Sequence, residues 1–422
     1  MSGGFAVLKN RDFTLYLSSR FFASVATQMI IMAVGWQVYH ITGRVLDLGL
    51  IGLSQFLPFL CLALISGHVA DQFDRRIIIM LGHCCYAICA LVLLGLAVVE
   101  LTTTLPIFAV LAIFGVTRAF MLPASQSFVP TIVPASILRN ALPINSSVNQ
   151  VATIAGPSIG GIIYAVAEAR FGRNSGAGVV YGAAAALLLL AIALVAMIRK
   201  RRVPAGRTAL SWTTLLQGLH FVWHRKTVLG AISLDLFAVL FGGATALLPA
   251  YTRDVLHAGP EVFGYLRAAP GLGAGATAIW LAFRPVARRV GATMFTGVAA
   301  FGVATIVLGL TRSFWVAMSA LVILGAGDMI SVFIRSLLVQ LETPDEIRGR
   351  VSAVNAVFIG ASNELGEFES GMTAAWFGLV PAIVLGGAAT LVVTVLWARV
   401  LFPKLWRMQT FEQLKEFNPH GT

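Results

Sequence analysis

The sequence predicts an all-α membrane protein with twelve transmembrane helices in two six-helix bundles. Hydrophobic residues make up 58% of the chain and charged residues 11%, a balance that a water-exposed surface does not tolerate. Stretches of about 20 apolar residues, the length needed to cross the hydrocarbon core, recur along the chain between short polar turns. The predicted spans are 13–41, 47–70, 77–99, 105–125, 145–167, 177–198, 228–252, 261–283, 293–311, 314–337, 351–377 and 380–402.

The basic residues predict the orientation of these helices. With both ends of the chain in the cytoplasm, 21 lysines and arginines lie in loops or helix ends on that side. Five lie on the opposite side: Arg44, Arg170, Arg173, Arg253 and Arg312. The positive-inside rule therefore predicts cytoplasmic termini in a bacterial inner membrane. The net charge of +12 is explained by this orientation. It does not indicate nucleic-acid binding, because no loop is long enough to hold a basic module of that kind.

A polar interval that opens with Arg199-Lys200-Arg201-Arg202 divides the spans six and six. Two such halves are typical of transporters built from repeats, with the substrate site between them near the midplane. Within the interval, residues 211–223 are either an amphipathic helix on the membrane surface or an ordinary linker. We expect an N-terminal bundle at 1–198, a cytoplasmic linker at 199–226, a C-terminal bundle at 227–403 and a cytoplasmic tail at 404–422.

The turn after the second span carries the most specific motif, Gly67-His68-Val69-Ala70-Asp71-Gln72-Phe73-Asp74-Arg75-Arg76. Gly67 lets two helices approach closely, and Asp71, on the same helical face, can accept hydrogen bonds or cap a neighbouring helix. Arg75 and Arg76 would anchor the turn at the headgroups. A fainter copy at 283–291 keeps paired arginines and lacks the aspartate. The alternative, a plain positive-inside turn, does not explain the spacing of the glycine and the aspartate.

At this motif the chain resembles the major facilitator superfamily, whose turn reads Gly-x-x-x-Asp-x-x-Gly-Arg-Arg/Lys. Asp74 stands where that pattern has its second glycine. The resemblance implies the major facilitator fold, a monomer, and a role for Asp71, Arg75 and Arg76 in stabilising the outward-facing state. It covers the full length and sharpens toward the drug and siderophore exporter branch, typified by the enterobactin exporter, at 46–76, 118–134, 145–161, 344–351 and 363–371.

The fifth span contains Gly156-Pro157-Ser158-Ile159-Gly160-Gly161, which resembles the antiporter motif of that superfamily. Pro157 frees a backbone carbonyl, and Gly156, Gly160 and Gly161 permit close helix contact and bending. Glycine–proline pairs are common in membrane helices, so the motif alone says little. Its resemblance favours export over uptake.

Ionisable residues inside the spans mark the predicted cavity. Each costs roughly 2.5–3.5 kcal/mol on the insertion scale, so such residues normally face a cavity or a partner. In the resembled fold, the first, fourth, seventh and tenth helices line the central cavity. These four spans contain Arg20, Arg118, Asp235, Asp328 and Arg335.

Two hypotheses account for these charges. In the first, opposite charges from the two halves form salt bridges that close the cytoplasmic gate, and Asp328 also pairs locally with Arg335. In the second, Arg20 and Arg118 attract an anionic or catecholate-like substrate while a carboxylate, Asp235 or Asp328, carries the coupling proton. The same residue can form a salt bridge at the gate and also bind the substrate or the proton.

The eleventh span contains three carboxylates in Asn363-Glu364-Leu365-Gly366-Glu367-Phe368-Glu369. Glu364 and Glu367 share a helical face, whereas Glu369 points elsewhere. Three ionised acids so close repel one another, so we expect one of them to bind a proton near neutral pH and to couple it to transport. The alternative is that the helix ends early and these acids lie in an outer loop.

Polar residues at helical spacing complete the predicted cavity wall. The alternative for each is a hydrogen bond that holds two helices together. These residues are Arg20, Ser24 and Gln28 in the first span, Asn145, Asn149 and Thr153 in the fifth, and Asn355, Ser362 and Asn363 in the eleventh.

Motifs of other functional classes are missing from the sequence. None of the five lysines follows a glycine, so there is no Gly-Lys-Ser/Thr phosphate-binding loop, and an ATP-driven pump is not expected. The loops contain no metal-ligand cluster, nucleophile elbow or dinucleotide fingerprint. We therefore expect no enzymatic activity, no cofactor and no metal, and energy must come from a gradient.

The sequence predicts a secondary transporter that exports a small amphiphilic molecule, a siderophore or a drug, across the inner membrane by alternating access. Its predicted partners are this substrate, the proton and the lipid bilayer. An uptake permease of the same fold and a membrane substrate sensor without net transport are the alternatives. Dependence on the pH gradient separates transport from sensing, and the direction of flux separates export from uptake.

Overall fold

The computed structural model describes residues 5–99, 103–172, 174–199, 212–284, 286–344 and 347–414, and this part of the chain contains helices and no strand. The long helices are α1 (Arg11–Thr42), α2 (Val45–Gln72), α3 (Arg75–Val98), α4 (Leu105–Ile132), α5 (Ala135–Phe171), α6 (Ser175–Ala196), α8 (Lys226–Phe241), α10 (Pro260–Phe283), α11 (Val290–Leu310), α12 (Phe314–Glu342), α13 (Arg348–Phe377) and α14 (Leu379–Leu396). The shorter ones are η1 (Phe5–Lys9), α7 (Trp212–His224), η2 (Ala244–Leu247), α9 (Leu248–Ala250), η3 (Tyr251–Val255), η4 (Trp397–Leu401), α15 (Pro403–Trp406) and η5 (Phe411–Leu414).

Each predicted span coincides with one long helix, except the seventh, which is divided among α8 and the short elements after it. In the described part, ten helical stretches are long and apolar enough to cross a membrane, including Lys226–Val255, which joins α8 to the short elements after it. The other two predicted spans are α10, with 24 residues, and α13, with 30. Arg267 makes α10 more polar, and the carboxylates of the Glu364–Glu369 stretch do the same for α13. These two helices therefore carry groups that normally face a cavity or a partner.

Local sequence determines where α1 begins and ends. The side chain of Asn10 caps the helix by accepting a hydrogen bond from the Phe13 N–H at 3.3 Å. Gly43, at φ +61°, ends it by donating its N–H to the Tyr39 carbonyl. Because the left-handed conformation carries little strain in glycine, the chain can reverse there and begin α2 at Val45.

The seventh span is broken, which was not predicted. α8 ends at Phe241, and Gly242 and Gly243 lead into η2, α9 and the π-helical turn η3. A Cβ on Gly243 would lie 2.6 Å from the carbonyl carbon of Gly366 in α13, so only glycine permits this close approach. The break therefore lies directly against the helix that carries the three glutamates.

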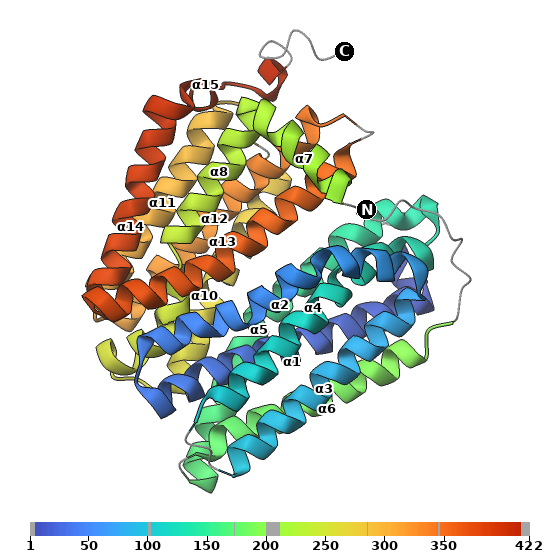
Figure 1. The fold of residues 1–422 in the computed structure, drawn as a ribbon, viewed down its shortest axis with the longest axis vertical. Helices are drawn as coiled ribbons and strands as arrows, with labels where there is room; N and C mark the ends of the chain where they lie inside the picture. Colours follow the sequence, from blue (N-terminus) through green and yellow to red (C-terminus); the bar gives the residue numbers. More distant parts are fainter. Residues whose placement is uncertain are drawn as a thin grey trace. The chain divides into compact units, whose positions relative to one another are not determined.

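The helices form two compact units. Unit 1 contains Met1–Gly43, Leu50–Leu210 and His257–Ala268, and unit 2 contains Arg44–Gly49, Ser211–Leu256 and Ala269–Thr422. In unit 1, α1 packs against α5 and α6, and α3 packs against α4 and α6. In unit 2, α11 packs against α12 and α14, and α8 packs against α13 and α14. Figure 1 shows these helices as long neighbouring rods within each unit.

Each unit has its own apolar core. In unit 1, Phe13 and Tyr16 of α1 pack with Phe128 of α4 in a buried cluster that extends to α3 and α6. In unit 2, Phe295 of α11 and Leu338 of α12 belong to a corresponding cluster with α8 and α14. Within a bilayer, close van der Waals packing of such side chains is a main favourable term for helix association. The cavities described below are therefore held between packed helices.

The predicted linker contains a helix in the stretch that was predicted to be either an amphipathic helix on the membrane surface or an ordinary linker. α7 covers Trp212–His224. Trp223 is 68% exposed and Leu219 is also exposed, while Val222 is buried against α8 and α13. The side chains of Leu215 and Leu216, the linker residues 200–211 and the tail beyond 414 lie outside the described part.

Candidate functional site

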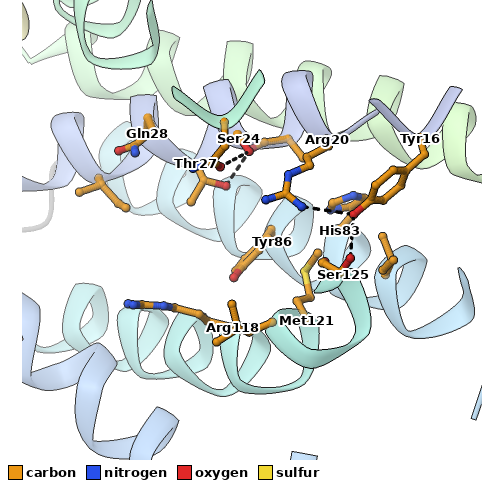
Figure 2. Close-up of a pocket in the computed structure, with 15 residues that line it drawn as sticks. Tyr16, Arg20, Ser24, Thr27, Gln28, His83, Tyr86, Arg118, Met121 and Ser125 are labelled. Atoms are coloured by element: carbon orange, nitrogen blue, oxygen red, sulfur yellow. Dashed lines mark hydrogen bonds between the residues drawn. The ribbon is translucent and has the colours of Figure 1, made fainter. Parts of the chain in front are cut away.

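Unit 1 contains a cavity of about 250 Å³ among α1, α3, α4 and α5 (Figure 2). It brings together five of the residues predicted for the cavity wall in this half, Arg20, Ser24, Gln28, Arg118 and Asn149, whereas Asn145 and Thr153 are not among its lining residues. The other lining residues are Tyr16, Ala23, Thr27, Ile31, Ile79, His83, Tyr86, Met121, Leu122 and Ser125. Because none of the fifteen lining residues is acidic, the cavity wall carries positive charge.

Arg20 is held in place by neutral groups. Its Nη1 donates a hydrogen bond to Tyr16 Oη at 3.3 Å, one helical turn earlier. Tyr16 Oη in turn donates to the Ser125 carbonyl of α4 at 3.3 Å. Arg20 Nε is buried and has no hydrogen-bond partner among the described residues. A tyrosine hydroxyl orients the guanidinium without cancelling its charge.

Arg118 enters the cavity from α4. Its Cζ lies 5.2 Å from the ring centroid of Phe59 in α2, a cation–π contact. Figure 2 shows Arg20 and Arg118 on opposite sides of Tyr86, which α3 contributes. The arrangement places two cations around one aromatic side chain.

His83 of α3 lines the same cavity and was not predicted. It is 4% exposed, and its Nε2 lies 3.5 Å from Ser19 Oγ. Its Nδ1 is buried without a hydrogen-bond partner in the described part of the chain. The sequence did contain the signal, because a histidine inside an apolar span satisfies the same criterion that selected Arg20.

Polar residues of α1 and α5 form hydrogen bonds between these two helices. Ser24 Oγ donates to Asn149 Oδ1 at 3.5 Å, and Gln28 Nε2 donates to Thr153 Oγ1 at 3.4 Å. These long, weak bonds join α1 to α5. Ser24, Gln28 and Asn149 also line the cavity, so the same residues form part of its wall and join the two helices.

Unit 2 contains a second cavity, of about 200 Å³, with the opposite charge. It holds three carboxylates and one guanidinium, from Asp235, Asp328, Glu367 and Arg335. Its other lining residues are Val239, Gly242, Gly243, Thr245, Pro270, Phe301, Leu324, Val332, Ile359, Ser362 and Asn363. Predicted residues from the seventh, tenth and eleventh spans therefore meet in one place.

A buried ion pair joins α8 to α12. Arg335 Nη1 lies 2.9 Å from Asp235 Oδ2, and the two residues are 2% and 4% exposed. The same nitrogen donates to Asn355 Oδ1 of α13 at 3.4 Å. The predicted local pairing of Arg335 with Asp328 is replaced by this ion pair. Seven residues along a helix correspond to about 10.5 Å of rise, whereas α8 brings Asp235 directly alongside.

Comparison with known proteins identifies the family. The family model described as transmembrane secretion effector, a class of major facilitator transporters, matches residues 2–420. The chain belongs to this family. It is similar to an uncharacterized MFS-type transporter, YfiS, of Bacillus subtilis, with 24% identity over 391 residues, 89% of this chain and 90% of that one. It is also similar to the multidrug efflux pump Tap of Mycolicibacterium fortuitum, with 25% identity over 404 residues, 90% of this chain and 95% of that one.

Solved transporters share the fold. A bacterial homologue of the human lysosomal transporter Spinster matches with a TM-score of 0.75 and 15% identity, over 94% of this chain and 98% of that one. A D-xylose-proton symporter matches with a TM-score of 0.70 and 14% identity, over 93% and 98%. The predicted major facilitator fold is confirmed, and the protein is a membrane transporter and not an enzyme.

The turn between α2 and α3 of the transporter uses its charged residues for helix capping. Asp74 Oδ1 accepts the Arg76 N–H at 2.9 Å and so caps α3. Arg76 Nε and Nη2 donate to the carbonyls of Val195 and Ala196, at 3.0 and 2.5 Å, at the end of α6. Arg76 therefore satisfies carbonyls left open by the end of α6, and the anchoring of this turn at the headgroups stays a prediction.

The remaining residues of that motif stay at the level of prediction. Gly67 and Asp71 belong to α2, in a stretch whose side chains lie outside what the structure describes. Arg75 is the first residue of α3. The role of Asp71, Arg75 and Arg76 in stabilising the outward-facing state stays a prediction.

The fainter copy of the turn, before α11, is closed by backbone contacts. Arg289 adopts φ +53°, and the N–H groups of Val290 and Gly291 donate to the carbonyls of Gln409 and Met408 at 3.3 and 3.0 Å. The start of α11 is thus capped by the C-terminal segment. This copy of the turn has no aspartate, and the backbone carbonyls of Met408 and Gln409 accept the N–H groups in its place.

The glycines of the Gly156-Pro157 motif make close contacts. A Cβ on Gly156 would lie 2.5 Å from Gln28 Cβ, and a Cβ on Gly160 would lie 3.3 Å from the Met29 Cα, so both face α1. Gly161 faces α10, where a Cβ would lie 2.6 Å from the Pro260 carbonyl oxygen. α5 continues past Pro157 to Phe171 without a break. The motif therefore lets α5 pack tightly on two sides.

The three glutamates all lie within one continuous helix. α13 extends from Arg348 to Phe377, so the alternative in which it ends early is wrong. Glu367 lines the unit 2 cavity, whereas Glu364 and Glu369 are not among its lining residues. Glu369 Oε1 accepts a hydrogen bond from Thr373 Oγ1 at 2.6 Å.

Proposed function

We propose that this transporter exports small amphiphilic molecules across the bacterial inner membrane, works as a monomer with cytoplasmic termini, and is driven by proton influx. The observation that carries the proposal is the unequal charge of the two cavities. Unit 1 lines its cavity with two arginines and no carboxylate, and unit 2 lines its cavity with three carboxylates and one arginine. One cavity suits an anionic or electron-rich substrate, and the other suits a proton.

Proton uptake is assigned to unit 2. Asp235 is engaged by Arg335 at 2.9 Å, which leaves Asp328 and Glu367 as the further carboxylates of the cavity. In a medium of low dielectric, neutralising one of two neighbouring negative charges lowers the electrostatic energy. Binding a proton there changes the relative energies of the two transport states and biases the return step.

Substrate binding is assigned to unit 1. Arg20 and Arg118 can donate charge-assisted hydrogen bonds to a carboxylate, sulfonate or catecholate oxygen. Tyr86 offers an aromatic face between them, against which a planar ring can pack. Similarity to a multidrug efflux pump supports drug export, and resemblance to the siderophore exporter branch supports a catecholate.

The test is transport into everted membrane vesicles that contain the wild type, Glu367→Gln or the matched control Glu364→Gln. A fluorescent amphiphilic anion and a labelled catecholate siderophore serve as substrates, with and without an uncoupler. We expect the wild type and Glu364→Gln to accumulate at least one of them, and the uncoupler to abolish this. Glu367→Gln should lose gradient-driven accumulation and retain substrate exchange across the membrane.

Other outcomes would contradict separate parts of the proposal. Loss of substrate from energised everted vesicles would indicate an uptake permease. Binding without flux in either direction would indicate a sensor. Coupled accumulation by Glu367→Gln that equals the wild type would exclude Glu367 as the proton carrier and leave Asp328 to be tested by Asp328→Asn.

A further inference from the structure

We propose that unit 2 binds the phosphate-bearing headgroup of an anionic phospholipid in a pocket between the start of α8 and the end of α14. The pocket has a volume of about 480 Å³. Its walls are residues 224–227, where α7 meets α8, and residues 400–405, where η4 meets α15. Neither wall belongs to the substrate or proton site, so this inference does not depend on the proposed function.

The pocket is strongly basic. Four of its ten lining residues, His224, Arg225, Lys226 and Lys404, are basic, and none is acidic. Arg225 is held in place by Phe221, whose ring centroid lies 5.5 Å from its Cζ. A phosphate group accepts several charge-assisted hydrogen bonds at once, so such a wall can bind it from more than one side.

His224 is oriented so that one ring nitrogen remains available. Its Nδ1 lies 2.8 Å from the His220 carbonyl oxygen, and its ring centroid lies 4.1 Å from that of His220. A carbonyl oxygen only accepts hydrogen bonds, so Nδ1 carries a proton, and Nε2 has no hydrogen-bond partner among the described residues. The neighbouring Trp223 is 68% exposed, and exposed tryptophans favour the headgroup level of a membrane.

The shape of the pocket is fixed by packing between its walls. α14 passes into the π-helical turn η4, and the Phe402 N–H donates to the Trp397 carbonyl at 2.8 Å. Trp397 Nε1 donates to Ser233 Oγ of α8 at 3.0 Å. A Cβ on Gly230 would lie 2.7 Å from Phe402 Cδ1, so the two walls meet closely there. Lys404 is thereby held near the start of α8.

An exposed apolar stripe leads into the pocket and favours a lipid over a soluble phosphate. Val392, Val395, Leu396, Val400 and Leu401 follow one another along α14 and η4, and each is at least 40% exposed. A soluble phosphate would use only the basic wall. A phospholipid uses both features, with its acyl chains along the stripe and its headgroup in the pocket, as in other basic pockets of membrane proteins.

The test is thermal unfolding of the purified full-length transporter in a nonionic detergent. Phosphatidylglycerol, phosphatidylcholine or inorganic phosphate is added, and bound phospholipid is measured by mass spectrometry. The variants are Lys226→Gln/Lys404→Gln and the conservative Lys226→Arg/Lys404→Arg. The matched control Lys9→Gln/Arg288→Gln removes two exposed charges that lie outside the pocket.

We expect phosphatidylglycerol to raise the unfolding temperature of the wild type, the control and the arginine variant more than phosphatidylcholine does. Lys226→Gln/Lys404→Gln should bind phosphatidylglycerol at least tenfold more weakly. Equal protection by inorganic phosphate would overturn the assignment to a lipid. Unchanged binding in the glutamine variant, or an equal loss in the Lys9/Arg288 control, would overturn the site.

Discussion

Arg20 in unit 1 and Arg335 in unit 2 are both guanidinium groups inside predicted membrane spans, but their surroundings differ. Arg20 donates to a tyrosine hydroxyl at 3.3 Å, and none of the residues lining its cavity is acidic. Arg335 lies 2.9 Å from the Asp235 carboxylate and also contacts Asn355. The charge of Arg335 is compensated by a carboxylate of its own unit, whereas the guanidinium of Arg20 donates to a neutral hydroxyl.

This difference shows that the partner of a buried charge decides what the charge can do. An arginine paired with a carboxylate links helices, and its loss leaves an uncompensated charge behind. An arginine held by a hydroxyl keeps its capacity to bind an anion. Mutations at the two positions should therefore separate a structural role from a binding role.

The largest expected effect is loss of stability when the unit 2 ion pair is broken. Asp235→Asn and Arg335→Gln should each reduce the free energy of unfolding by about 3–5 kcal/mol, because each leaves a buried charge without its partner. The double variant should be more stable than either single one. Denaturant unfolding of the purified protein, followed by tryptophan fluorescence, measures this. Losses that simply add in the double variant would show that the pair is not coupled.

A change in transport with little change in stability is expected for unit 1. Arg20→Gln should raise the KM for an anionic amphiphile about tenfold, since a hydrogen bond to a charged group contributes roughly 1.5–3 kcal/mol. Arg20→Lys should retain part of the affinity, and a cationic amphiphile should be affected less. Initial rates in everted vesicles give the KM. If Arg20→Gln unfolds as readily as Arg335→Gln, the contrast between the units is wrong.

The smallest effect is expected at the capped turn of unit 1. Arg76→Gln removes the donors to the Val195 and Ala196 carbonyls and should lower the free energy of unfolding by about 1 kcal/mol. The matched control is Arg288→Gln, an exposed arginine in the fainter copy of the turn, where backbone contacts close α11. Thermal unfolding should separate the two by about 1 °C, because the entropy of unfolding grows with chain length. An equal shift for both would exclude the capping role.

The sequence predicted the helices well because apolar length is a local property. Spacing along a helix predicts that Arg20, Ser24 and Gln28 share one face of α1, whereas the resemblance to the superfamily implied that α1 and α4, with Arg118, line the same cavity. The exception was His83, where the criterion for ionisable residues in a span was available and was not applied.

Features that depend on two distant segments were not predicted. Asp235 and Arg335 are 100 residues apart in sequence, and no local pattern selects one of them as the partner of the other. The break at Gly242 and Gly243 depends on how closely α13 approaches α8. In both cases the tertiary arrangement of helices decides which polar group lies beside which.

Asp74 has a consequence for how related chains are recognised. At this position, where the superfamily pattern has glycine, aspartate caps α3, because its side chain accepts the Arg76 N–H. Glycine, aspartate, asparagine, serine and threonine are all favoured at a helix N-cap. A sequence pattern that requires glycine at this position excludes family members such as this chain. A pattern that accepts any residue favoured at a helix N-cap includes them. Natural variation at this site should accordingly follow capping preference rather than side-chain size.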